Sequence, residues 1–150
     1  MSESLRKYVS ECRSSGQRIV ATNGCFDILH VGHLTLLSFA RGQGDVLIVG
    51  LNSDSSVKKL KGESRPIFPQ ESRATMLRAL RVVDFVEIFD GTNCSDFLRE
   101  VKPDFYVKSS DYNLETLNGM EKSALEEADT KIVFCNFIPS LSTTGVISKL

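Results

Sequence analysis

The two histidines of this chain lie three residues apart, in the segment His30-Val31-Gly32-His33. Imidazoles at this spacing can face one side of a turn, where their N–H groups could donate hydrogen bonds to phosphoryl oxygens. Gly32 lets the backbone come close to a bound phosphate. A helix that begins near His33 would add unpaired amides and the positive end of its dipole. The segment therefore predicts a centre that stabilises charge during displacement at phosphorus.

Two other interpretations of the pair carry less weight. His30 could end a strand while His33 serves as a polar residue at the start of a helix. The pair could also bind a metal ion, but two ligands are too few for a closed zinc site. The four cysteines are scattered without CxxC spacing and predict free thiols, mostly buried.

Basic residues follow the second predicted strand and could face phosphates. Lys58, Lys59, Lys61 and Arg65 occur close together, and we expect Lys61 and Arg65 to contact anions, although a solvated charged loop has the same composition. Arg73 lies near the start of a predicted helix, where the dipole disfavours a cation. Its presence there calls for an anionic partner, for which we expect a bound phosphate.

Strand and helix patterns alternate along the chain. The expected elements are helices over 2–15, from about 33 to 40, and over 70–80, 94–101, 117–128 and 143–150, strands over 18–22, 45–51, 85–89, 105–107 and 131–136, and a polar loop over 52–68. This order predicts a Rossmann-like, doubly wound α/β fold with a mainly parallel five-stranded sheet and helices on both faces. We expect one domain over 1–150, with an N-terminal helix (1–16) packed on it.

Ligands of such folds bind beyond the carboxyl ends of the strands. Asp27, Asp54 and Asp111 each follow a predicted strand and are candidates for Mg²⁺, ribose or sugar hydroxyls, with turn or capping roles as the alternative. The segment Ser142-Thr143-Thr144 opens the last predicted helix, where its hydroxyls and amides could cap the helix and hold phosphates.

Composition excludes several classes of protein. The net charge of -1 offers no global basic field for nucleic acid. No apolar run reaches the length of about 18 residues that a membrane span needs, and the polar N-terminus lacks a secretory signal. We therefore expect a cytoplasmic protein without nucleic-acid or membrane partners.

The segment from Asn23 to His33 resembles the GxFDxxHxGH signature of the cytidylyltransferase-like nucleotidyltransferase superfamily. Within it, the chain is similar over about 18–150 to the D-glycero-β-D-manno-heptose 1-phosphate adenylyltransferases. The supporting segments are 52–54, 58–66, 71–73, 108–112 and 142–144.

This resemblance implies transfer of AMP from ATP, with Mg²⁺, to heptose 1-phosphate, giving ADP-heptose for lipopolysaccharide and related glycans, and pyrophosphate. His30, His33 and Lys61 would be catalytic. The residues implied for the nucleotide are Asn23, Gly24, Cys25, Phe26, Gly32, His33, Arg73, Lys108, Asp111, Ser142, Thr143 and Thr144. Those implied for the sugar phosphate are Asp27, Asn52, Asp54, Lys61 and Arg65. A homodimer is expected, as is a separate sugar kinase, because this sequence carries no kinase domain.

One departure from the family leaves the preference for the base open, because Ser109-Ser110 replaces a glycine pair that is usual there. Phe137-Ile138-Pro139-Ser140 stands where related cytidylyltransferases carry an arginine, which favours ATP over CTP. The first alternative is a glycerol-3-phosphate-type cytidylyltransferase that uses CTP. The second is a nucleotide-binding module without turnover. The presence of both histidines and of the basic segment argues against it.

Overall fold

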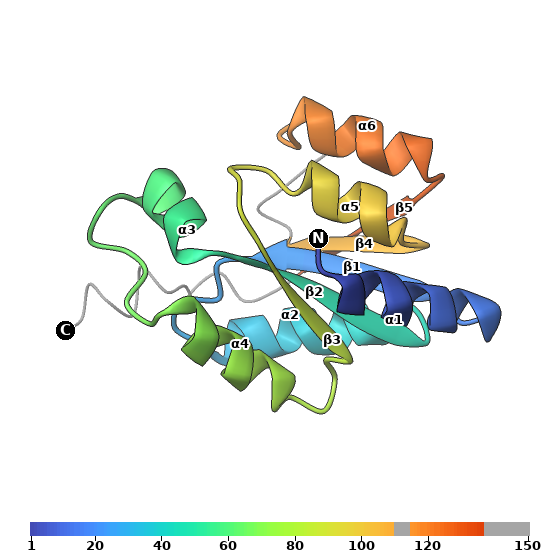
Figure 1. Ribbon diagram of the computed structural model, residues 1–150, viewed down its shortest axis with the longest axis horizontal. Coiled ribbons are helices and arrows are strands. Elements are labelled where there is room, and N and C mark those ends of the chain that lie inside the picture. Colours follow the sequence, from blue (N-terminus) through green and yellow to red (C-terminus); the bar gives the residue numbers. More distant parts are fainter. Residues whose placement is uncertain (110–114, 137–150) are drawn as a thin grey trace.

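The computed structural model describes residues 1–109 and 115–136. Over these residues the chain forms one five-stranded sheet, all of whose strand pairs are parallel (Figure 1). The strands are β1 (Ile19–Gly24), β2 (Val46–Asn52), β3 (Phe85–Phe89), β4 (Phe105–Ser109) and β5 (Lys131–Cys135). The doubly wound α/β fold predicted from the alternating pattern is confirmed.

Helices cover both faces of the sheet (Figure 1). They are α1 (Glu3–Ser14), α2 (Val31–Arg41), α3 (Asp54–Lys61), α4 (Gln70–Arg78), α5 (Ser95–Val101) and α6 (Gly119–Glu127). One apolar cluster joins α1, α5 and α6 to the sheet, and a second joins α2 and α4 to it. All seven residues of β2 are buried because both faces of this strand are covered, which explains its unbroken apolar run.

The strand order β3-β2-β1-β4-β5 places a topological switch point between β1 and β4. The chain moves from β1 outward to β2 and β3, and then crosses back to lay β4 on the other side of β1. Connections that leave β1 and β4 therefore diverge and open a crevice at the carboxyl edge of the sheet. The fold alone marks this edge as the place for a ligand.

The N-terminal helix packs against the sheet and the edge strand β3. The Ser2 side chain caps α1 by accepting a hydrogen bond from the Leu5 amide at 3.1 Å. The Ser2 amide and hydroxyl both donate to the Glu87 carboxylate of β3, each at 2.6 Å. Leu5 and Cys12 are buried in the core. The cap, the hydrogen bonds to the buried carboxylate and the apolar contacts together hold α1 against the sheet.

Two predicted boundaries were wrong. The second helix begins at Val31 and not near His33, because His30 takes the N-cap position. Part of the predicted 52–68 loop is the helix α3, which Ser53 caps and whose Val57 is buried. The helix predicted over 143–150 lies outside the described residues. Among the helices that are described, none combines the length and apolarity needed to cross a membrane.

Candidate active site

The side chains of His30 and His33 cap the N-terminus of α2. The Gly32 amide donates to Nδ1 of His30 at 3.1 Å, and the His30 amide donates to Nδ1 of His33 at 3.4 Å. These bonds form a capping box in which imidazoles replace the usual hydroxyl and carboxylate. Both rings are thereby held at the carboxyl edge of β1, beside the switch point.

The capping bonds also determine where the ring protons lie. Because Nδ1 of His30 accepts the Gly32 amide, the neutral His30 ring carries its proton on Nε2, and we infer the same for His33, whose Nδ1 accepts from the His30 amide. The two rings stack with their centroids 3.9 Å apart and an interplanar angle of 28°. The arrangement is a pair of adjacent imidazole N–H donors.

Burial keeps the two imidazoles uncharged. It lowers the pKa of His30 below its ordinary value. For His33, burial and then the charge of His30 lower the pKa to about 4, although a hydrogen bond with the Ile28 backbone opposes the shift. Near neutral pH the pair therefore acts as hydrogen-bond donors and not as cations.

Phe26 and Gly24 orient His33. Phe26 is buried in the left-handed region at φ 44, and its ring lies 5.2 Å from the His33 ring, centroid to centroid. A Cβ atom at Gly24 would approach the Phe26 ring to 3.1 Å, which explains the glycine. The Phe26 ring is covered by the protein, and the contact of this residue with the nucleotide stays a prediction.

Asp27 and Arg65 were predicted to bind the sugar phosphate, but they bind each other. Asp27 is 3% exposed, and one of its oxygens accepts a hydrogen bond from Nε of Arg65. Its other oxygen accepts from the amides of Ile67, at 2.8 Å, and Phe68, at 3.1 Å. A buried carboxylate needs such partners, so Asp27 is a clamp that ties the 62–69 connection to the loop after β1.

The anionic partner that Arg73 requires is a side chain of this protein and not a phosphate. Arg73 is 1% exposed, and its Nη2 donates to Oδ1 of Asp54 at 2.8 Å. Its other donors go to the carbonyl oxygens of Phe68 (2.9 Å), Cys25 (2.6 Å) and Asn52 (2.9 Å). These contacts give Arg73 a structural role, in which one guanidinium joins the ends of β1 and β2 to the start of α4, and its contact with the nucleotide stays a prediction.

Asn52 and Asp54 also have partners inside the protein. Asn52 is buried, and its side-chain amide donates to the hydroxyl of Ser56 at 2.8 Å. Asp54 pairs with Arg73, and its backbone amide donates to Gln70. These contacts shape the start of α3 and leave the predicted role at the substrate without support. Among the described residues no cluster of three or more histidine, cysteine or acidic side chains could hold a metal ion.

Lys61 is brought to the same edge of the sheet. It is the last, exposed residue of α3, which ends at Gly62 with φ 99. Burial raises the pKa of the Cys25 thiol, and the charge of Lys61 is the largest of the influences that lower it. This places the Lys61 ammonium within electrostatic reach of the loop after β1, whereas the charge of Lys59 acts on Asp90. Lys61 therefore remains a candidate for contact with phosphates.

Asn23 and Lys108 meet at the switch point, where β1 and β4 end. Oδ1 of Asn23 accepts hydrogen bonds from Nζ of Lys108 at 2.8 Å and from the hydroxyl of Tyr106 at 2.6 Å. The sequence interpretation missed Tyr106, because it had treated this residue only as part of an apolar strand. Asp111 and the segment 142–144, also predicted at this edge, lie outside the described residues.

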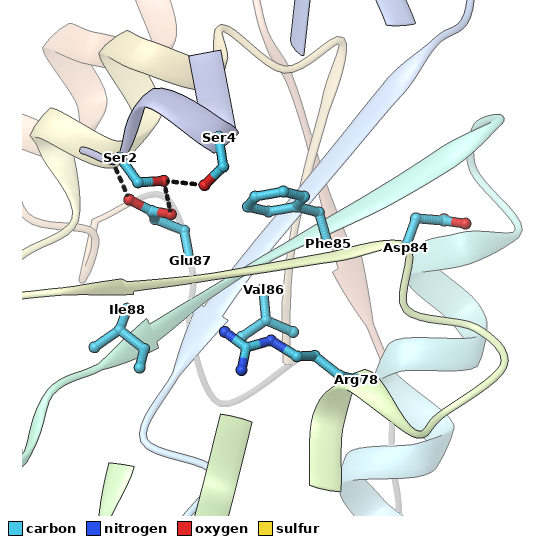
Figure 2. A pocket seen from close by; sticks show the side chains of 8 residues that line it. All are labelled: Ser2, Ser4, Arg78, Asp84, Phe85, Val86, Glu87 and Ile88. Carbon is cyan, nitrogen blue, oxygen red and sulfur yellow. Dashed lines mark hydrogen bonds between the residues drawn. The ribbon is translucent and has the colours of Figure 1, made fainter. Parts of the chain in front are cut away.

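A separate hollow lies along the edge strand β3 (Figure 2). Its volume is about 530 Å³, and it is lined by Ser2, Ser4, Arg78, Asp84, Phe85, Val86, Glu87 and Ile88. None of these residues belongs to the predicted site. The chemistry-bearing residues therefore lie at the carboxyl edge of the sheet and not in this hollow.

Comparison with known proteins identifies the family of this chain. The chain matches the cytidylyltransferase-like family over residues 21–148 and belongs to it. It is accordingly a nucleotidyltransferase, whose HxGH segment lies at the start of α2.

Similar proteins indicate which members of the family this chain resembles. The chain is 43% identical to "Bifunctional protein HldE" of Wolinella succinogenes, with 99% of this chain and 30% of the relative covered. It is 45% identical to the protein of the same name from Proteus mirabilis, with 97% and 30% covered. The chain thus spans about 30% of the length of these relatives.

Solved structures support the fold. The lipopolysaccharide core biosynthesis protein from Thermoplasma volcanium is 27% identical, with a TM-score of 0.66 over 82% of this chain and 98% of that one. A pantoate-beta-alanine ligase from Francisella tularensis shares the fold at 17% identity, with a TM-score of 0.61 over 97% of this chain and 71% of that one.

Proposed function

We propose that this chain transfers AMP from ATP to D-glycero-β-D-manno-heptose 1-phosphate, releasing ADP-heptose and pyrophosphate. The observation that carries the proposal is the stacked, uncharged His30–His33 pair at the N-terminus of α2. The similarity to the HldE proteins of Wolinella succinogenes and Proteus mirabilis supports the choice of heptose phosphate as substrate.

The reaction is an in-line displacement at phosphorus. An oxygen of the sugar 1-phosphate attacks the α-phosphorus of ATP, a new P–O bond forms, and the bond to the bridging oxygen breaks as pyrophosphate leaves with the electron pair. The Nε2–H groups of His30 and His33 donate hydrogen bonds to phosphoryl oxygens, where negative charge builds up. The protein contributes positioning and charge stabilisation, and no covalent intermediate is needed.

Lys61 supplies the positive charge for the phosphates. Its ammonium is exposed and lies near the loop after β1, whereas Arg65 and Arg73 are already paired with Asp27 and Asp54. Those two carboxylates are therefore poor ligands for Mg²⁺. We propose that Mg²⁺ enters with ATP, bound mainly by phosphate oxygens and water, which is usual for this ion.

The choice of ATP over CTP rests on the sequence resemblance in segments 52–54, 58–66 and 142–144. A glycerol-3-phosphate-type cytidylyltransferase would use the same histidine chemistry, and a nucleotide-binding module would bind without turnover. We further propose a cytoplasmic location, a homodimer, and a kinase activity that supplies the sugar 1-phosphate.

The test is pyrophosphate release by the purified chain. ATP and CTP are each offered with heptose 1-phosphate, glycerol 3-phosphate and other sugar phosphates, and kcat/KM is measured. We expect the highest value for ATP with heptose 1-phosphate. A higher value with CTP would move the protein to the cytidylyltransferases, and nucleotide binding without turnover would make it a binding module.

A further inference from the structure

Asn23 belongs to the residues predicted to bind the nucleotide. The oxygen of its side-chain amide accepts two hydrogen bonds from other side chains. Tyr106 donates its hydroxyl and Lys108 its ammonium to Oδ1 of Asn23, at 2.6 and 2.8 Å. The Lys108 ammonium also lies 5.4 Å from the centroid of the Tyr106 ring. These three side chains come from the ends of β1 and β4, which flank the switch point.

The chemistry of these partners determines the orientation of the Asn23 amide. An ammonium group has only donors, so the oxygen of the amide, and not its NH₂ group, must face Lys108. The NH₂ group of Asn23 then points away from both partners. Rotation of the amide by half a turn would set its NH₂ group against the ammonium of Lys108 and lose that hydrogen bond.

The NH₂ group reaches solvent at this edge of the sheet. Among the described residues it makes no hydrogen bond, and none of their buried side-chain nitrogen or oxygen atoms lacks a partner. Nδ2 of Asn23 is therefore accessible, and Asn23 lies near the carboxyl end of β1, just before the Cys25–His30 loop. It is an oriented donor next to the crevice in which the nucleotide is proposed to bind.

Tyr106 is held rigidly behind this donor. The residue is fully buried, and its hydroxyl also lies 3.3 Å from Sγ of Cys94. Sγ and the amide of Cys94 in turn contact the buried carboxylate of Glu121, at 3.3 and 3.0 Å. Burial, and next the charge of Glu121, raise the pKa of Cys94 to about 12, so this thiol stays protonated and neutral.

We propose that Tyr106 is a positioning residue for nucleotide binding. Its hydroxyl, together with Lys108, holds the Asn23 amide so that the NH₂ group donates a hydrogen bond to an acceptor atom of the nucleotide. The inference rests on the proposed function. It goes beyond that function by assigning the direction of one specific donor and a buried residue that helps to hold it.

Two variants test the roles of Tyr106 and Asn23. Tyr106→Phe keeps the buried ring but removes the hydroxyl, so the Asn23 amide loses one of the two hydrogen bonds that hold it. Asn23→Asp keeps both accepted hydrogen bonds and replaces the NH₂ donor by an oxygen. Titration calorimetry with ATP should show Kd raised roughly 3- to 10-fold by the first change, which is the loss of about one hydrogen bond, and by more for the second because a carboxylate repels phosphates.

Two further measurements separate positioning from a general loss of structure. The double variant Tyr106→Phe/Asn23→Asp should bind ATP no more weakly than Asn23→Asp alone, because both changes act on the same donor. The KM for the sugar phosphate should stay at the parent value in both single variants. Cys94→Ala removes the neighbour on the other side of the Tyr106 hydroxyl, and its Kd for ATP should rise less than that of Tyr106→Phe, because both hydrogen bonds to Asn23 remain.

Failure of this inference is distinct from failure of the proposed function. A parent protein that binds neither ATP nor CTP overturns the proposed function. If the parent protein binds ATP, and Tyr106→Phe and Asn23→Asp bind it with the same Kd as the parent, then only the positioning role of Tyr106 is overturned. Additive losses in the double variant would also overturn it.

Discussion

The rings of His30 and His33 stack with their centroids 3.9 Å apart, while Nδ1 of each ring accepts a hydrogen bond from the backbone of the same turn. One short segment thus builds both the cap of a helix and a pair of donors. A variant that preserves the cap can therefore separate the structural role from the chemical one.

His33→Gln should remove the chemistry and keep the fold. Glutamine at the third helical position can still accept the hydrogen bond from the His30 amide, because it is a usual residue of a capping box. Loss of one preorganised donor typically lowers the rate on the order of 10²–10³-fold, and we expect a fall in kcat of that size. Circular dichroism and thermal unfolding should match the parent protein. A folded variant with parental kcat would contradict the catalytic role.

The stability of the protein should depend on pH through His33. Its pKa falls from 6.5 to about 4 on folding, so between these values the unfolded chain binds a proton that the folded chain does not. Stability is therefore complete above about pH 7 and is lost as the pH falls toward 4, by up to about 3 kcal/mol. Urea unfolding at several pH values should show a shallower loss in His33→Gln. Equal pH slopes in the two proteins would contradict the buried, neutral state of His33.

The Asp27 clamp should contribute to stability. Asp27→Ala leaves Arg65 and the amides of the 67–68 segment without their acceptor, which typically costs about 3–5 kcal/mol for a buried pair. The matched control is Asp45→Ala, whose exposed ion pair with Arg18 should contribute far less to stability. Chemical unfolding of both variants measures the difference. Similar losses for the two would show that Asp27 does not act as a clamp.

Arg73 should behave as a structural residue. Arg73→Lys cannot reach its three carbonyl partners and Asp54 at once, so the melting temperature should fall by several degrees. The control is Arg78→Lys on the exposed side of the same helix, which should melt like the parent protein. An unchanged melting temperature in Arg73→Lys, with weakened ATP binding, would restore the predicted contact with phosphate.

Lys61→Ala should weaken binding of ATP and lower turnover, because it removes an exposed charge near the loop after β1. Lys59→Ala is the matched control, since Lys59 lies on the same helix and its charge acts on Asp90. Titration calorimetry and steady-state kinetics of the two variants compare them directly. Identical values would mean that the charge of Lys61 is only a solvated part of the helix surface.

The sequence by itself determined the fold class and the centre of the site. Buried parallel strands need continuous apolar runs, and such runs alternating with helical patterns are visible in one dimension. The HxGH segment could also be located, because its function needs only four consecutive residues at the start of a helix. The helix α3 was missed because its polar composition resembles a loop, and its single cap and the buried Val57 are weak signals.

Only the tertiary structure decided the roles of the charged residues. The pairs Asp27–Arg65 and Asp54–Arg73 join residues 38 and 19 positions apart, and no local pattern shows that such groups meet. The sequence shows the same residue type whether its charge is free to bind a ligand or is paired inside the protein. Burial distinguishes them, because a buried ion must find its partner within the fold, while the exposed Lys61 keeps its charge for a ligand.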